Sequence, residues 1–470
     1  MPIPNFVTEI TPSYWLQNVR LPLACLDDSI PWASTIPTSM GPSLTEPLIE
    51  AHVRVEVGKI TTILPANQAL DPNQPIWDLS QGMVWPCFVD MHTHLDKGHI
   101  WPRQPNPHGT FEAALDSVVS DRRRHWTRED LYPRMSFALR CSYAHGTQAL
   151  RTHLDCGEGQ EKTSFALLRD LQAEWADKIT LQGVPLVAID YYDRPESLKL
   201  ADLVADHGGI LGAVLYPQPG LREKIEGIFR LAQARGLDLD FHADESLDPE
   251  AEGLHLVAQT RLNLEFTGQV TCGHCCSLSV QPESKAQETI DLVSRAGIAV
   301  VSLPMCNLYL QDRRPGQTPR YRGVTLVNEL NQRGATVALA SDNCRDPFFA
   351  YGDHDMVEVF TQAVRIGHLD HPWGIGPRLL PKDQRLLWAC RTSVCWAWGV
   401  TLTWFCLRLE PLMRCYPDPR PIASYYAGAE PLTLPCLTTV NWMNYWPANE
   451  QSWYTTSFAA LDQSGRCRGW

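Results

Sequence analysis

From residue 85 onward the chain alternates short apolar runs with longer amphipathic stretches, and this alternation restricts its possible folds more than any other feature. Eight runs have the length and composition of buried strands: CFVDMHTH, GTQALRTHLD, ITLQGVPLVAI, GILGAVLYP, LDLDFHADE, QVTCGH, GIAVVSLP and ATVALASDN. Helical stretches such as residues 223–236 and 283–297 separate many of them. Strand and helix alternating at this count predict an α/β fold built as a (β/α)8 TIM-type barrel.

Three segments of the chain differ in pattern. Residues 1–81 are Pro-rich and contain an alternating run at 51–64, which predicts the N-terminal part of a small flanking β-sandwich module. Residues 82–385 form the predicted barrel. Residues 386–470 have few periodic segments but hold 8 of the 16 tryptophans and 6 of the 15 cysteines, so we expect an atypical tail that leaves the β module incomplete.

Composition excludes several classes of protein. The net charge of −13 opposes binding to a nucleic-acid backbone, which requires clustered Lys and Arg. No apolar run reaches the roughly 18–20 residues that a membrane span needs. The first residues, MPIPNFVTEI, lack the pattern of a secretion signal, so the 15 cysteines are expected to be thiols. These features predict a cytoplasmic enzyme that acts on a small molecule, and leave open whether it is a homo-oligomer.

Histidines and acidic residues follow the predicted strands. His92 and His94 are spaced i, i+2, so in a strand both side chains project from one face, as metal ligands do. Further such residues end later strands: His153, His242, Asp244, Glu245, His274 and Asp342. Because barrel active sites are built at the carboxyl ends of several strands, we expect these side chains to meet there.

These residue types suit metal-assisted hydrolysis at an sp² carbon. One divalent ion, Zn or Fe, and a water can be held by His92, His94, His242 and Asp342. Such an ion lowers the pKa of its water to about 7. Glu245 is then the expected proton donor and acceptor, His274 the group that polarises a carbonyl or the attacking hydroxide, and Asp342 a second acceptor for the water's proton.

With these motifs the chain resembles the amidohydrolase superfamily, and within it the cytosine deaminase-like branch. The resemblance covers roughly residues 85–385 through HTHLDK, LRTHLD, FHADE, GHCCS, LYLQDR, YRGVT and SDNCRDPFFAYG. It implies the metal ligands named above, Glu245 as the proton shuttle to a ring nitrogen and the departing amine, and His274 as the partner of the hydroxide. It also implies that Phe348 closes over the substrate ring. The fourth strand ends without the lysine that carries a bridging carbamate in binuclear members, so one ion is implied.

Two departures from this branch concern substrate recognition. The segment VPLVAIDYYD lacks the glutamine that reads a pyrimidine edge, and Asn343 stands where a second Asp follows the metal-binding Asp. We therefore expect a hydrolase of non-peptide C–N bonds that deaminates an aminated N-heterocycle, with cytosine as the leading substrate and Asn343 and Phe348 as substrate-binding residues. The alternatives are a cyclic-amide or N-alkylamine hydrolase of the same superfamily, and a metal-binding pseudoenzyme disabled by its tail.

Two other features are given less weight. Cys272 and Cys275 form a C-x-x-C pair, but the pair follows a strand late in the predicted barrel, whereas a redox motif opens a helix early in a small domain. His153 can be a metal ligand or a packing residue, and packing is favoured.

The tail suggests an altered reading frame. Family members end with strands of the type G-x-x-A-D-L-V-L-F, whereas this chain has VTLTWFCLRLEP at 400–411. One permissible back-translation of that segment, read two bases later, encodes DLDLVLFEAR. We therefore hypothesise that residues 386–470 contain a frameshifted translation. Independent reads of the coding DNA test this: a frame change near codon 388 is expected, and one uninterrupted frame that encodes the present tail would reject it.

Overall fold

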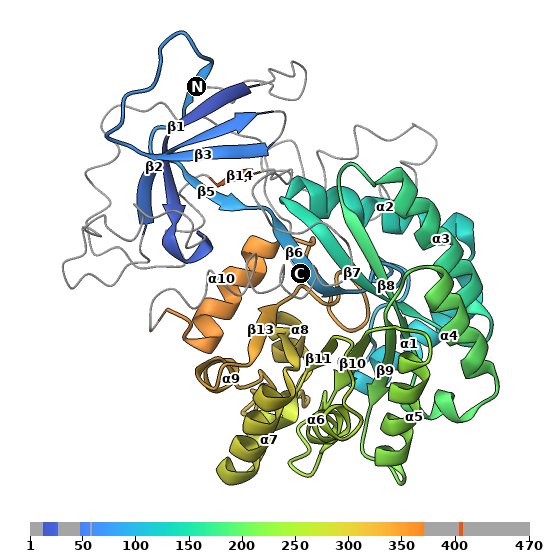
Figure 1. Ribbon diagram of the computed structural model, residues 1–470. Coiled ribbons are helices and arrows are strands. Elements are labelled where there is room, and N and C mark those ends of the chain that lie inside the picture. The colour runs from blue at the N-terminus through green and yellow to red at the C-terminus, as the bar shows by residue number, and fades with distance from the viewer. Residues whose placement is uncertain (1–12, 27–47, 57–58, 371–403, 408–470) are drawn as a thin grey trace. The chain divides into compact units, whose positions relative to one another are not determined.

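The computed structural model describes residues 13–26, 48–56, 59–370 and 404–407 (Figure 1). The predicted tail therefore lies outside the described residues, apart from one short strand. No helix within these ranges is long and apolar enough to cross a membrane.

The N-terminal strands form one mixed six-stranded sheet in the order β14-β5-β1-β2-β3, with β4 also paired to β1. Its strands are β1 (Ser13–Pro22), β2 (Leu48–Glu56), β3 (Lys59–Pro65), β4 (Ile76–Asp78), β5 (Met83–Pro86) and β14 (Trp404–Leu407). A short 3-10 helix, η1 (Leu23–Cys25), follows β1. The alternating run at 51–64 forms parts of β2 and β3, which pair antiparallel as its pattern predicts. Within the described residues the module is a single sheet, and the β-sandwich stays a prediction because most of residues 386–470 lie outside them.

All eight predicted strands of the main region are present and run parallel to their neighbours. They are β6 (Phe88–Thr93), β7 (Thr147–Asp155), β8 (Thr180–Leu186), β9 (Leu211–Leu215), β10 (Leu239–Ala243), β11 (Val270–His274), β12 (Ala299–Ser302) and β13 (Thr336–Leu339). Hydrogen bonding groups them into a sheet β6-β7-β8 and a sheet β9-β10-β11-β12-β13. Two isolated parallel bridges, Thr93 with Asp342 and Ala188 with Val214, link the segments at the borders of these sheets.

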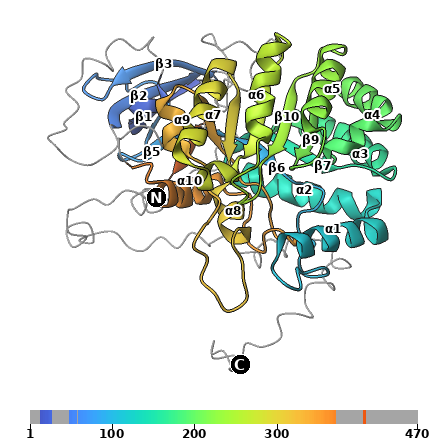
Figure 2. The same ribbon diagram turned by 90° about the horizontal axis from the view of Figure 1, so that it is seen from below.

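Helices flank these strands (Figures 1 and 2). They are α1 (Phe111–His125), α2 (Arg128–Ala144), α3 (Gln160–Glu174), α4 (Glu196–Asp206), α5 (Leu221–Gln233), α6 (Gly253–Asn263), α7 (Glu283–Ala296), α8 (Pro304–Leu310), α9 (Val327–Gln332) and α10 (Met356–Gly367). The 3-10 turns η2 (Ile189–Asp193) and η3 (Cys276–Val280) follow β8 and β11. The amphipathic stretches predicted at 223–236 and 283–297 correspond to α5 and α7.

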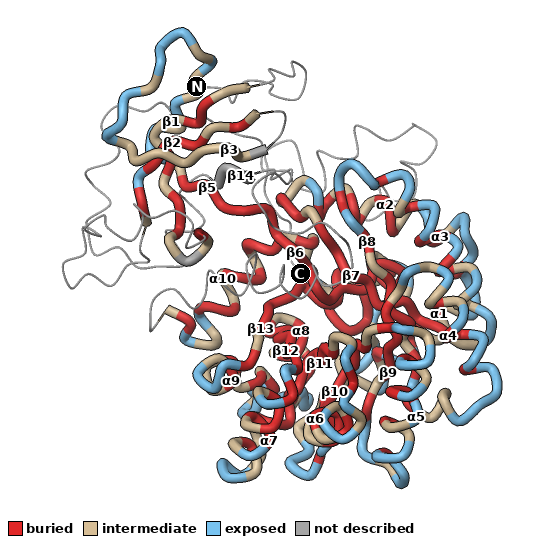
Figure 3. Tube along the Cα trace, in the orientation of Figure 1, coloured by how far each residue is buried: buried red, intermediate tan, exposed pale blue. Residues whose placement is uncertain are grey.

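Amphipathic spacing determines how the helices pack. In α5 the buried residues Ile225, Ile228, Phe229 and Ala232 follow the i, i+3, i+4, i+7 pattern of one helix face. Figure 3 shows the result, with buried residues concentrated on the strands and exposed residues on the outer sides of the helices. Gly297, with φ of +63°, ends α7 in the left-handed conformation that glycine adopts most readily.

A buried ion pair joins two strands that are not neighbours in a sheet, β7 and β10. The Arg151 guanidinium on β7 donates to the Asp240 carboxylate on β10 at 2.6 Å, and both side chains are at most 4% exposed. Arg151 also donates to Gln182 and Thr271. Burial raises the pKa of Asp240 to about 6, although Arg151 opposes this shift. The guanidinium therefore neutralises a carboxylate that would otherwise be charged and unpaired in the core.

We predict that Arg151→Met lowers the free energy of unfolding by about 3–5 kcal/mol at pH 8, because it leaves the charge of Asp240 uncompensated. The loss should be smaller at pH 5, since protonation then removes that charge. Urea unfolding at both pH values measures the effect. Arg123→Met, in the exposed Arg123–Glu158 pair, is the matched control and should change stability little. An equal loss in the two variants at pH 8 would contradict the prediction.

Candidate active site

The four residues predicted to hold a metal lie together at the carboxyl ends of the strands. His92 belongs to β6 and His94 follows that strand, His242 belongs to β10, and Asp342 lies three residues beyond β13. Each is at most 5% exposed. Two hydrogen bonds hold Asp342 beside β6: its amide donates to the carbonyl of His92 at 2.9 Å, and the Thr93 hydroxyl donates to the carbonyl of Asp342 at 2.8 Å.

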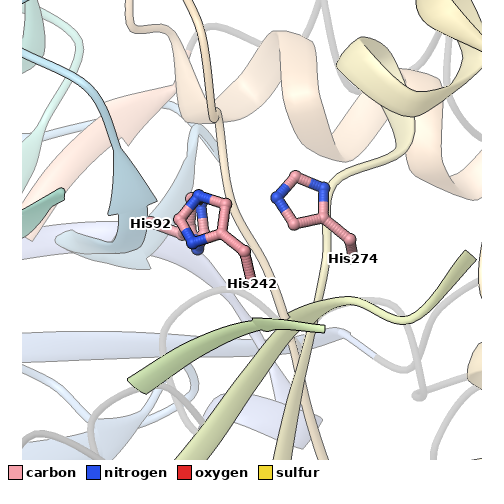
Figure 4. Close-up of side chains that lie close together, drawn as sticks. All are labelled: His92, His242 and His274. Atoms are coloured by element: carbon pink, nitrogen blue, oxygen red, sulfur yellow. The ribbon is translucent and has the colours of Figure 1, made fainter. Parts of the chain in front are cut away.

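The atoms that could bind an ion converge on one point. His242 Nε2 lies 3.1 Å from His92 Nε2 and 3.5 Å from His94 Nε2. Asp342 Oδ1 lies 3.2 Å from His94 Nε2 and 3.7 Å from His92 Nε2. Figure 4 shows the rings of His92 and His242 close together, with the ring of His274 beside them. These spacings are near the separations of about 3.3–3.8 Å between ligands that share one Zn²⁺ at bond lengths of 2.0–2.3 Å.

The electrostatics of this group also suit a cation. Burial, reinforced by the neighbouring cationic and histidine side chains, holds the pKa of His92 and His242 well below the usual value, so both imidazoles are neutral and keep a free lone pair. Burial would raise the pKa of Asp342, but the close approach of the His94 and His274 imidazoles brings it below its usual range. Both carboxylate oxygens of Asp342 are buried, and neither has a hydrogen-bond partner among the described residues. Such oxygens are costly unless they are paired, and a divalent ion would satisfy them.

A backbone carbonyl fixes the orientation of His94. Its Nδ1 lies 3.2 Å from the carbonyl oxygen of His153, which assigns the ring hydrogen to Nδ1 and leaves Nε2 free to face Asp342. The ring of His153 packs against His92 with centroids 3.9 Å apart, and its Nε2 lies 3.9 Å from Asp240. His153 therefore contacts His92 through ring packing, and with His92 and Asp240 it also forms a group whose potential ligand atoms lie within 4.8 Å of one another.

The proposed proton-transfer residues form a second group beside the first. Glu245 Oε1 lies 3.2 Å from His274 Nδ1. The side-chain amide of Asn307, on α8, lies 3.0 Å from His274 Nδ1 and 3.4 Å from Glu245 Oε1. His274 Nε2 is buried and has no hydrogen-bond partner among the described residues. One ring nitrogen of His274 lies within 4.8 Å of a ring nitrogen of His92 and of His242. The pair thus presents one carboxyl group and one imidazole nitrogen toward the four predicted ligands.

Glu245 has the environment of a group that can carry a proton at neutral pH. Burial raises its pKa well above the usual value, and repulsion from Asp342 adds to the shift, whereas Lys97 reduces it. Burial lowers the pKa of His274 to about 4, so its imidazole is neutral. Burial therefore favours the uncharged form of both groups.

Asn343 and Phe348, predicted to bind substrate, are buried on the loop that follows Asp342. The Asn343 amide donates to Asp346 at 2.8 Å, and Asp346 also accepts from the backbone amides of Phe348 and Phe349. The ring of Phe348 packs edge-on against Phe111 with centroids 5.3 Å apart. Asp346 therefore organises the turn that positions both residues.

Sequence reasoning assigned no role to Lys97 or Asn307, which the structure places at the site. The Lys97 ammonium is buried, pairs with Asp155 at 2.9 Å and lies 5.2 Å from the centroid of the Phe348 ring. Burial lowers its pKa, but Asp155 and Asp96 outweigh that effect and raise it, so it stays charged. The only sequence signal for Lys97 is its place in HTHLDK, and Asn307 has no local signal because α8 reaches Glu245 through the tertiary fold.

Two residues of the site have a strained backbone, and a glycine leaves room for the ring of His92. His274 and Asp342 have φ values of +69° and +63°, in the left-handed region where a non-glycine residue costs of order 1–3 kcal/mol. Gly273 precedes His274, and a Cβ there would lie 2.9 Å from the imidazole of His92. The glycine therefore allows β11 to approach the ring of His92.

Cys272 and Cys275 are both buried thiols, and Cys275 Sγ contacts the carbonyl of Cys272 at 3.8 Å.

Comparison with known proteins gives three related findings. Residues 144–387 match the sequence model of the amidohydrolase family. The chain is 50% identical to a pterin deaminase of Rhizobium rhizogenes, over 74% of this chain and 79% of that protein. It is 26% identical to an N-isopropylammelide isopropyl amidohydrolase of a Pseudomonas species, over 62% of this chain and 71% of that protein.

The solved structures add a likeness of fold. The crystal structure of 5-methylcytosine deaminase from Klebsiella pneumoniae aligns with a TM-score of 0.64 at 23% sequence identity, and covers 76% of this chain and 81% of that one. At this level of identity the likeness concerns the fold alone.

We predict that Gly273→Ala displaces the ring of His92 and lowers the metal bound after dialysis by tenfold or more, since losing the position of one ligand removes most of the affinity of such a site. Elemental analysis of folded protein measures this. The matched control is Gly227→Ala in the middle of α5, where a Cβ meets nothing within 4 Å; it should stabilise the fold by about 0.5–1 kcal/mol and leave metal content unchanged. Equal metal content in both variants would contradict the assigned role of Gly273.

Proposed function

Because the chain belongs to the amidohydrolase family and is a hydrolase acting on C–N bonds, we propose that it hydrolytically deaminates a pterin, a fused bicyclic heterocycle with an exocyclic amino group. The observation that carries this proposal is the position of His92, His94, His242 and Asp342 beside the Glu245–His274 pair. The reaction replaces an amino group on an sp² ring carbon by oxygen and releases ammonia.

The choice of a pterin revises the leading substrate from cytosine. A relative that shares half of its residues with this chain over three quarters of its length is named for pterin, whereas the pyrimidine comparison rests on a likeness of fold. The missing glutamine in residues 184–193 and the presence of Asn343 agree with a different ring edge. Buried polar groups discriminate strongly against a ring that leaves them unpaired.

We propose that one divalent ion, Zn or Fe, is held by His92, His94, His242 and Asp342. When bound it supplies Lewis acidity, so that a water molecule loses a proton near neutral pH. Glu245 is placed to accept that proton and deliver it to a ring nitrogen next to the reacting carbon, and then to protonate the departing amine. His274 stabilises the charge on the attacking oxygen, while Asn307 orients both Glu245 and His274.

Substrate positioning is proposed for the loop after Asp342. Phe348 provides an aromatic face against the ring, and the buried Lys97 ammonium adds a fixed positive charge beside it. Asn343 donates to Asp346, and its carbonyl oxygen accepts from the Cys306 thiol at 3.4 Å, so one N–H and one oxygen lone pair of the amide remain for the substrate.

For the fold, we propose that β6 to β13 close as a (β/α)8 barrel spanning residues 82–385. The bridges Thr93–Asp342 and Ala188–Val214 support closure, because they link the borders of the two parallel sheets in chain order. The strand β14, paired antiparallel to β5, falls within residues 400–411, where the altered reading frame would encode the family's closing strand.

Two other functions are compatible with the same residues. Release of an alkylamine is favoured by the likeness to the N-isopropylammelide enzyme. A pseudoenzyme that binds metal without turnover would follow if the tail prevents a productive fold.

Ammonia release by the metal-loaded full chain, tested with pterin, cytosine, 5-methylcytosine and N-isopropylammelide, distinguishes these functions. We expect turnover of pterin, and expect Glu245→Gln to lower kcat about 10²–10⁴-fold while it retains the metal. Glu250→Gln, at an exposed carboxylate five residues later, is the matched control and should keep full activity.

Other outcomes would replace the proposal. Faster turnover of cytosine would restore the pyrimidine assignment, and isopropylamine in place of ammonia would favour the alkylamine hydrolase. A folded, metal-loaded chain without activity on any of these rings would favour the pseudoenzyme.

A further inference from the structure

A second cluster of metal-binding side chains lies outside the active site. It consists of His99 in the loop after β6, Cys344 in the loop after β13, and His354 just before α10. One potential ligand atom from each residue lies within 4.8 Å of the other two. None of the three belongs to the group proposed to hold the catalytic ion.

The polar atoms of this cluster are buried without partners. His354 is 2% exposed, and neither of its ring nitrogens has a hydrogen-bond partner among the described residues. The same is true of His99 Nε2. Cys344 is a free thiol that is 2% exposed. Buried nitrogens usually have a partner, so three unpartnered ones in a single cluster require an explanation.

Protonation does not provide that explanation. Burial lowers the pKa of His354 to about 3, and the nearby charges of His145 and Arg345 lower it further. Burial and the charges of His354, Arg345 and Arg134 hold the pKa of His99 well below its usual value. Both imidazoles therefore stay neutral and keep a lone pair, which is the form that binds a metal.

The backbone holds the three residues in place before any ion binds. The amide of His99 donates to the carbonyl of Cys344 at 3.1 Å. Arg345, the next residue after Cys344, makes two further hydrogen bonds. Its guanidinium donates to the carbonyl of Gly352 at 2.9 Å, and its backbone amide donates to the carbonyl of Tyr351 at 2.9 Å. These bonds join the loop that carries Cys344 to the segment that leads into His354. The rings of His99 and His354 lie with centroids 5.6 Å apart.

We propose that His99, Cys344 and His354 bind a second Zn²⁺ ion with a structural role. Two imidazoles and a thiolate suit Zn²⁺, and a water can complete the tetrahedron. Ligand atoms around one Zn²⁺ are about 3.3–3.8 Å apart, so each atom of this cluster would move inward by roughly 1 Å or less. The thiol proton leaves to solvent as the Zn–S bond forms. Burial raises the pKa of the free Cys344 thiol, whereas the nearby Arg345 guanidinium favours the thiolate.

An ion at this position would restrain two loops beside the active site. It would link the loop after His94 to the loop that carries Asn343, Asp346 and Phe348. Cys344 lies between Asn343 and Arg345, so coordination would restrain the loop proposed to position the substrate. The proposal does not depend on which ring the enzyme deaminates.

Metal stoichiometry and cobalt spectroscopy of the full chain test the proposal. The metal-free protein is titrated with Zn²⁺ and, separately, with Co²⁺. We expect two ions per chain, and expect bound Co²⁺ to give thiolate-to-cobalt charge-transfer absorption in the near ultraviolet. The proposed catalytic ligands are nitrogen and oxygen atoms only, so they cannot produce this band.

Variants assign the band to its ligands. Cys344→Ser combined with His354→Ala should halve the bound metal and abolish the band, whereas His242→Ala should halve the bound metal and keep the band. Cys272→Ser, at another buried thiol, is the matched control and should retain both ions and the band. One ion per wild-type chain without the band would overturn the proposal, as would a band that survives the Cys344 and His354 substitutions. If that variant does not fold, the wild-type stoichiometry and spectrum still decide.

Discussion

The structure depends on one electrostatic constraint: the convergence of buried lone pairs from His92, His94 and His242 on the unpaired carboxylate of Asp342. Burial keeps the imidazoles neutral, so they cannot neutralise the carboxylate by taking up protons. A divalent cation satisfies all four groups at once, which hydrogen bonds between them cannot do. The surrounding strands hold this arrangement, and the strained backbone at Asp342 is part of its cost.

The same burial that keeps the imidazoles of the proposed metal-binding group neutral also raises the pKa of Glu245. A carboxyl group whose pKa is raised is protonated more readily, so it can accept a proton from water and then donate it to a ring nitrogen and to the departing amine. Asp342 raises the pKa of Glu245 and Lys97 lowers it, so the two neighbours tune this residue in opposite directions. A bound cation would act in the same direction as Lys97, which links the proton affinity of Glu245 to metal occupancy.

The loop after β13 connects the two proposed metal sites. Asp342 faces the active site, Cys344 faces the second cluster, and Asp346 fixes the turn that places Phe348. Few side chains on this loop are free to change, because alternate residues serve different sites. The buried Arg151–Asp240 pair lies next to His153, whose ring packs against that of His92.

Local pattern was sufficient to locate all eight parallel strands and the residues that end them, because strand periodicity and the parallel arrangement place such residues at one edge. It was also sufficient to propose four metal ligands, His92, His94, His242 and Asp342. The same pattern suggested Glu245 as the proton shuttle and His274 as the residue that stabilises the attacking oxygen. Contacts between distant segments required the folded chain. Lys97 meets Phe348 and Asn307 meets Glu245 only after loops far apart in sequence pack together, and the spacing of residues along the chain contains no record of such contacts.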